Sequence, residues 1–89
     1  MREIRIRELR YDEARAILEN ELNRAFMEGE MRVHVLHGIG DGILKKMTLE
    51  VVSSLSFAKI ASQEIAPNYG VTVVDLLTAD PSLLRKYMR

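Results

Sequence analysis

The sequence predicts a two-layer α/β sandwich in which two helices cover one face of a mixed four-stranded sheet. Two short stretches alternate apolar and polar residues, and each is followed by a stretch whose apolar residues recur every three or four positions. Two further β-rich stretches flank a group of turn-forming residues. The resulting order of strand, helix, strand, helix, strand and strand predicts two right-handed crossovers and leaves the other sheet face open to solvent.

Length and composition leave room for a single domain. The chain has 89 residues, of which 47% are hydrophobic and 29% are charged, as is typical of a globular protein. It contains no Cys, which excludes disulfide scaffolds and thiolate metal sites, and its 13 basic residues balance 13 acidic ones. Apolar runs are too short for a membrane span or a signal peptide, so we expect a cytoplasmic protein with no membrane partner.

The first strand and the first helix lie in the N-terminal third of the chain. Residues 4–7 alternate two isoleucines with two arginines, the period of a strand with one buried face. A helix is expected from Asp12, which would cap it, to near Gly29. Its apolar stripe consists of Ala14, Ile17, Leu18, Leu22, Ala25 and Phe26.

The second strand and the second helix are joined by a glycine-rich turn. Residues 31–37 alternate again and stop at Gly38. Asp41 is available to cap the helix that follows. The apolar positions of that helix are Leu44, Met47, Val51, Val52 and Leu55.

The C-terminal third predicts a hairpin and a short tail. Residues 57–65 and 71–77 are the two strands, with Pro67, Asn68 and Gly70 between them as turn formers. Residues 1–77 would make up the domain, and 78–89 a C-terminal extension with a short helix that begins at Asp80.

The most informative segment for function is 37–42, which reads His-Gly-Ile-Gly-Asp-Gly. Glycines at alternate positions let the backbone approach a ligand closely, and the start of the next helix offers N–H groups and the positive end of a dipole. Such a junction suits a phosphate, although its spacing matches neither a dinucleotide fingerprint nor a P-loop. The alternative is that Gly38, Gly40 and Gly42 serve only a tight turn.

Four side chains are candidates for binding a phosphate or for catalysis at this junction. His37 could donate or accept a proton in phosphodiester cleavage, or only fix the loop by hydrogen bonds. Arg5 and Arg7 would share one strand face roughly 6.6 to 6.8 Å apart, a spacing that suits two successive phosphates, or would simply be solvated beside Glu3. Lys45 could contact an anion at the start of the second helix, or serve solubility.

The sequence resembles the Smr domain, a small module related to the C-terminal end of a branch of MutS proteins. Residues 37–42 match its His-Gly-x-Gly-x-Gly motif, 9–14 resemble its first strand-to-helix junction, and 70–74 resemble its last strand. The resemblance implies a fold similar to the C-terminal domain of translation initiation factor three, with strand order one, two, four, three. It also implies DNA or RNA binding, a link to DNA repair, and nicking endonuclease activity in some members.

The chain departs from the family pattern at three positions. The strand-one motif of the family commonly reads Leu-Asp-Leu, then His or Arg, then Gly; here Arg7 matches the basic position, but Arg5 replaces the Asp and Glu8 the Gly. Ile39 stands where the family often has a basic residue. These changes remove a carboxylate for a metal such as magnesium, a close backbone approach and a phosphate contact.

Three functions therefore remain in view. The first is a module that binds the phosphates of DNA or RNA through Arg5, Arg7, Lys45 and the glycine loop. The second adds a nick in the strand, assisted by His37 or by magnesium. The third is a catalytically inactive module that binds a protein partner or a second copy of itself.

Overall fold

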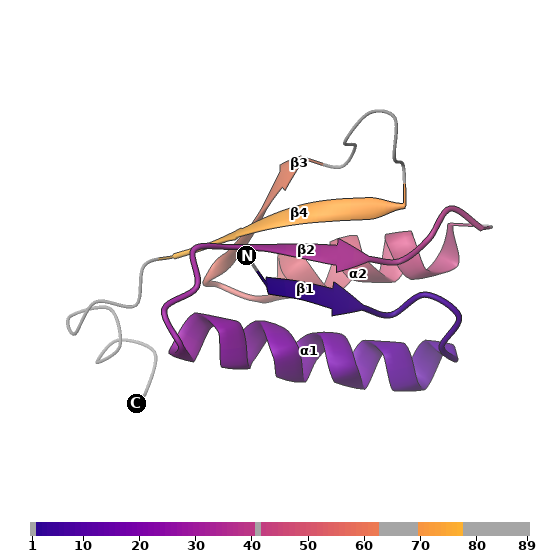
Figure 1. Ribbon diagram of the computed structural model, residues 1–89, viewed down its shortest axis with the longest axis horizontal. Coiled ribbons are helices and arrows are strands. Elements are labelled where there is room, and N and C mark those ends of the chain that lie inside the picture. The colour runs from indigo at the N-terminus through magenta and orange to yellow at the C-terminus, as the bar shows by residue number, and fades with distance from the viewer. Residues whose placement is uncertain (1, 41, 63–69, 78–89) are drawn as a thin grey trace.

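The computed structural model describes residues 2–40, 42–62 and 70–77, which contain four strands and two helices. Their order along the chain is the order predicted from the sequence. In sequence they are β1 (Arg2–Arg5), α1 (Tyr11–Met27), β2 (Arg32–Leu36), α2 (Ile43–Ser54), β3 (Ala58–Ser62) and β4 (Val71–Leu76) (Figure 1).

The four strands form one mixed sheet with the order β1-β2-β4-β3. β1 is parallel to β2, whereas β4 runs antiparallel to both β2 and β3. Buried side chains from both helices and from the inner face of the sheet form a single cluster, so both helices cover the same face. The predicted architecture and strand order are confirmed.

The core follows the two periodicities of the sequence. Val33 and Val35 of β2 are fully buried, and so are Leu18 and Leu22 of α1. On the outer face of the sheet, charged side chains pair across or along strands. Arg32 of β2, for example, bonds to Asp75 of β4 with 2.6 Å between Nε and Oδ1.

The N-terminal third differs from the prediction in detail. β1 ends at Arg5 because the next two N–H groups, those of Ile6 and Arg7, both donate to the carbonyl of Leu36, which breaks the regular ladder. The N-cap of α1 is Arg10, so Asp12 lies in the first turn, where its carboxylate still favours the positive end of the dipole. Ile17, predicted to be buried, is 37% exposed.

The described residues after α1 agree more closely with the prediction. The N-cap of α2 is Gly42, and the predicted cap Asp41 lies outside the described residues. β3 and β4 match the predicted hairpin strands, although residues 63–65 of the first lie outside the described residues. The turn residues Pro67 and Asn68 and the tail 78–89 also lie outside the described residues. Neither described helix has the length and hydrophobicity needed to cross a membrane.

Candidate functional site

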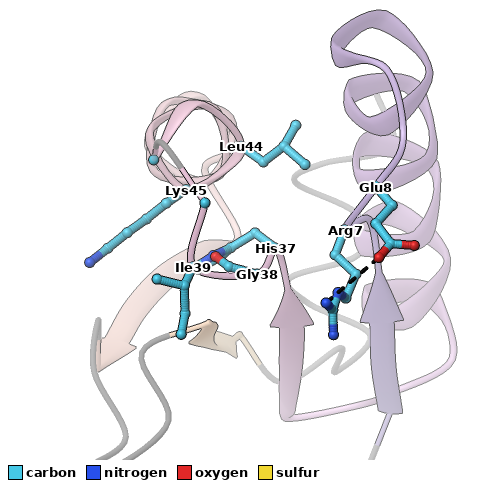
Figure 2. Close-up of a pocket in the computed structure, with 9 residues that line it drawn as sticks. Arg7, Glu8, His37, Gly38, Ile39, Leu44 and Lys45 are labelled. Atoms are coloured by element: carbon cyan, nitrogen blue, oxygen red, sulfur yellow. Dashed lines mark hydrogen bonds and ion pairs between the residues drawn. The ribbon is translucent and has the colours of Figure 1, made fainter.

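A cavity of about 230 Å³ lies where the carboxyl ends of β1 and β2 meet the start of α2. Because these two strands are parallel, their C-terminal loops leave the sheet at the same edge. A second cavity of about 270 Å³ shares part of its wall with the first. The first is lined by Arg7, Glu8, His37, Gly38, Ile39, Gly40, Gly42, Leu44 and Lys45 (Figure 2).

Two cations from different elements contribute to this cavity. Arg7 follows β1, and its side chain is 61% exposed. Lys45 lies in the first turn of α2, which is the positive end of that helix dipole. Figure 2 shows the two side chains on opposite sides of the glycine loop. The site therefore combines two positive groups with a helix start, an arrangement that attracts anions.

The glycine loop needs its glycines at two positions in particular. Gly38 has a φ of +78° and Gly42 a φ of +85°, a region that side chains with a Cβ rarely adopt. A Cβ at Gly38 would also lie 3.4 Å from the Cβ of Arg7, so the loop and the arginine pack closely. A residue with a side chain here would be strained by the positive φ and would lie in contact with Arg7.

The loop is anchored to the start of β4. The backbone N–H groups of His37 and Gly38 both donate to the carbonyl of Gly70, at 2.9 and 3.0 Å. The imidazole adds two more bonds, with 2.8 Å from Nδ1 to the carbonyl of Gly38 and 2.7 Å from Nε2 to the hydroxyl of Thr72. Four hydrogen bonds thus fix the base of the loop.

These bonds define the state of the imidazole. A carbonyl only accepts, so Nδ1 carries the proton, and Nε2 of the neutral ring accepts from the hydroxyl of Thr72. Burial lowers the pKa of His37 below its usual 6.5; the bond to Gly38 opposes this shift and the charge of Lys45 adds to it. The ring is therefore neutral at pH 7, and both nitrogens are already engaged.

Glu8 brings a negative charge into the same cavity. Its φ of 68° lies in the left-handed region, which glycine adopts far more readily than glutamate. Its Oε1 lies 3.7 Å from Nη2 of Arg7, in a pair whose side chains are 61% and 81% exposed. Such an exposed pair contributes little to stability, but the carboxylate weakens the positive potential that an anion would meet.

Two substitutions of Glu8 separate the effect of its charge on ligand affinity from the effect of its left-handed backbone on stability. Glu8→Gly should raise the affinity for a polyanion severalfold and raise the free energy of unfolding by up to about 1 kcal/mol, because it removes the charge and the left-handed side chain together. Glu8→Gln removes only the charge, so it should raise affinity similarly without the gain in stability. Fluorescence anisotropy and urea unfolding measure the two. Equal affinities in all three proteins would mean that the carboxylate does not act on the ligand.

The structure brings most of the predicted site residues together. His37, the three glycines and the cations Arg7 and Lys45 line one cavity. Arg5 does not line it; its side chain is 76% exposed and bonds through Nε to Glu3 at 2.8 Å. The break after β1 thus places Arg5 and Arg7 in different surroundings.

The sequence patterns did not reveal the two residues at the start of β4 that hold the glycine loop. Thr72 is fully buried and bonds to His37, and Gly70 accepts the two backbone N–H groups. The available signal was a hydroxyl residue within a run of valines, because a buried hydroxyl needs a hydrogen-bond partner.

The described lining of the cavity offers few ligands for magnesium. No group of three or more His, Asp or Glu among them is placed to hold a metal ion. Magnesium is bound chiefly through carboxylates. The described part of the cavity lining contributes only that of Glu8, which faces Arg7.

Comparison with known proteins agrees with this geometry. Residues 4–76 match the family model of the Smr domain. The crystal structure of the Smr domain of Thermus thermophilus MutS2 superimposes with a TM-score of 0.77 at 29% sequence identity, covering 85% of this chain and 98% of that one. A search of curated proteins found no match. The fold, the glycine motif and the match over 4–76 together place this chain in the Smr domain family.

Proposed function

We propose that this domain binds DNA or RNA by contacting backbone phosphates at the cavity between β1 and α2. Smr domains are known in general as nucleic-acid-binding or nuclease-like modules, which supports the class of ligand. The observation that carries the proposal is the convergence of Arg7, Lys45 and the glycine loop on one cavity. The guanidinium of Arg7 is suited to bidentate hydrogen bonds with a phosphate, and the ammonium of Lys45 would act as a point charge.

Binding without cleavage is the form of this function that the geometry supports best. A general acid or base needs a ring nitrogen within reach of the reacting group. Both nitrogens of His37 have partners inside the protein, at 2.8 and 2.7 Å. We therefore assign His37 a positioning role, in which it holds the glycine loop on β4.

The ionic strength of the solution should control affinity strongly. Each phosphate neutralised by a protein cation releases counterions, so two contacts give a slope of about −2 in a plot of log affinity against log salt concentration. A fourfold rise in salt should then weaken binding about tenfold. Anisotropy titrations of a labelled duplex at several salt concentrations measure this slope. No binding at low salt, or a slope near zero, would contradict phosphate recognition.

A further inference from the structure

We propose that Ile39 is an apolar wedge that contacts an unstacked base, so that the domain prefers nucleic acid with a bulge or another unstacked step over a regular duplex. The inference rests on the proposed function and adds to it the structural class of the ligand. It concerns the tip of the glycine loop, where the two cavities meet.

Ile39 is placed where a ligand of this site must meet it. Its side chain is 69% exposed, the largest exposed fraction of any large hydrophobic residue in the described part of the chain. It lines both cavities, as does Arg7. In the view of Figure 2 it projects from the loop between Lys45 and Arg7. A strand that contacts both cations would therefore pass over this isoleucine.

The base of the loop is rigid enough to present a wedge. The N–H groups of His37 and Gly38 bond to Gly70, and the His37 ring bonds to Thr72, so the start of β4 holds both the backbone and the side chain at the base of the loop. Groups that are already ordered lose little conformational entropy when a ligand binds. The glycines on both sides of Ile39 carry no side chain, so neither immediate neighbour covers the side chain of Ile39.

The chemistry of isoleucine selects the feature it can contact. It has no donor for a phosphate oxygen, so its surface is stabilised only against an apolar surface. The largest apolar surfaces of a nucleic acid are the base faces, which stacking covers in a regular duplex. Isoleucine is among the residues that insert between base steps where the stack opens. Arg7 and Lys45 would hold the phosphates while Ile39 fills the gap between two bases.

The experiment compares two labelled duplexes of the same sequence, one fully paired and one with unpaired adenines in one strand. A 2-aminopurine next to the bulge reports unstacking. Wild type should bind the bulged duplex about tenfold more tightly, the effect expected from burying one isoleucine side chain. Ile39→Ala should reduce this preference to about twofold, mainly by weakening the binding of the bulged duplex. It should also remove the rise in 2-aminopurine fluorescence, and Ile39→Phe should retain both effects.

The matched control is Ile43→Ala. Ile43 is also exposed, at 54%, and lies four residues away, but it lines neither of the two cavities at the loop. This variant should keep the full preference for the bulge. Thermal unfolding of each variant checks that the fold is intact, which the exposure of both positions favours.

The outcomes separate the wedge from the binding function itself. Binding of both duplexes with equal affinity by wild type, or an unchanged preference in Ile39→Ala, would overturn the wedge and leave phosphate binding standing. Loss of binding to both duplexes in Ile39→Ala would also overturn it, because the side chain would then serve affinity in general. Failure of wild type to bind either duplex at low salt would overturn the proposed function as well.

Discussion

Replacing Arg7 and Lys45 together by glutamate should weaken the binding of a short duplex at least about a hundredfold at low salt, or about 2.7 kcal/mol. The two changes turn both cations of the cavity into anions, so that two attractions become two repulsions beside the same phosphates. The salt dependence should nearly vanish, because no counterions are released at these positions. Anisotropy titrations of wild type and variant give both quantities.

Arg24→Glu is the matched control for this experiment. The Arg24 side chain is 66% exposed, close to the 61% of Arg7, and forms a similarly loose pair, 3.7 Å from Glu21. It lies 13 residues along α1 from Tyr11, or roughly 20 Å from the end of the helix near the cavity. Its reversal should change affinity about twofold at most.

The single variant Arg5→Glu tests whether the nucleic-acid interface extends from the cavity onto the outer face of the sheet. A loss of affinity comparable to that of Arg7→Glu would extend the contact onto the outer face of the sheet, as the sequence predicted. A small loss would confine it to the cavity. Undiminished binding by the Arg7 and Lys45 double variant would show that the nucleic acid binds elsewhere.

Replacing His37 by alanine should lower the free energy of unfolding by about 2 to 3 kcal/mol. The buried hydroxyl of Thr72 would lose its partner, and the loop would lose two of its four anchoring bonds. A domain of this length has roughly 4 to 13 kcal/mol of stability in all, so the loss should be plain in urea unfolding. A double-mutant cycle with Thr72→Val should give a coupling of about 1 kcal/mol between the two residues.

The same residue should make stability depend on pH below 6.5. Burial lowers the pKa of His37, so below 6.5 the unfolded chain binds more protons at this ring than the folded protein does. The free energy of unfolding should therefore fall as the pH drops from 6.5 toward 5, and this slope should be smaller in His37→Asn. The hydrogen bond from Arg32 lowers the pKa of Asp75 from 3.8, so its contribution is lost only at a lower pH.

A catalytic role for His37 would give a different pattern. If wild type relaxes supercoiled plasmid and His37→Asn folds stably but does not, then proton transfer outweighs positioning. If His37→Asn is as stable as wild type at every pH, the anchoring bonds contribute little. The positioning role instead predicts that Thr72→Val lowers both the stability of the domain and its affinity for nucleic acid. This variant keeps the imidazole of His37 but removes the hydroxyl that holds it.

Much of the site could be predicted because it depends on short-range patterns. The glycines of 37–42 follow an alternating stretch and precede a helical one, so the loop had to lie at a strand-to-helix junction. Arg7 is the last residue of the predicted first strand, and two parallel strands end at one edge of the sheet. The proximity of Arg7 to the glycine loop therefore followed from the predicted topology.

Other features of the site depend on atoms far apart in the chain. Whether β1 extends to Arg7 depends on the carbonyl of Leu36, to which two successive N–H groups donate. That break leaves Arg5 beside Glu3 on the outer face and places Arg7 in the cavity. The backbone strain at Glu8 likewise follows from the path of the loop between β1 and α1.

The sequence by itself determined the order of the elements, their buried faces and the position of the glycine loop, because periodicity and backbone freedom are properties of neighbouring residues. The tertiary structure alone decided the hydrogen-bond partners of His37, since Thr72 is 35 residues away and meets it only when β4 inserts between β2 and β3. A residue's chemistry is encoded locally, but its protonation state and its free hydrogen-bonding capacity depend on which distant groups the fold brings to it.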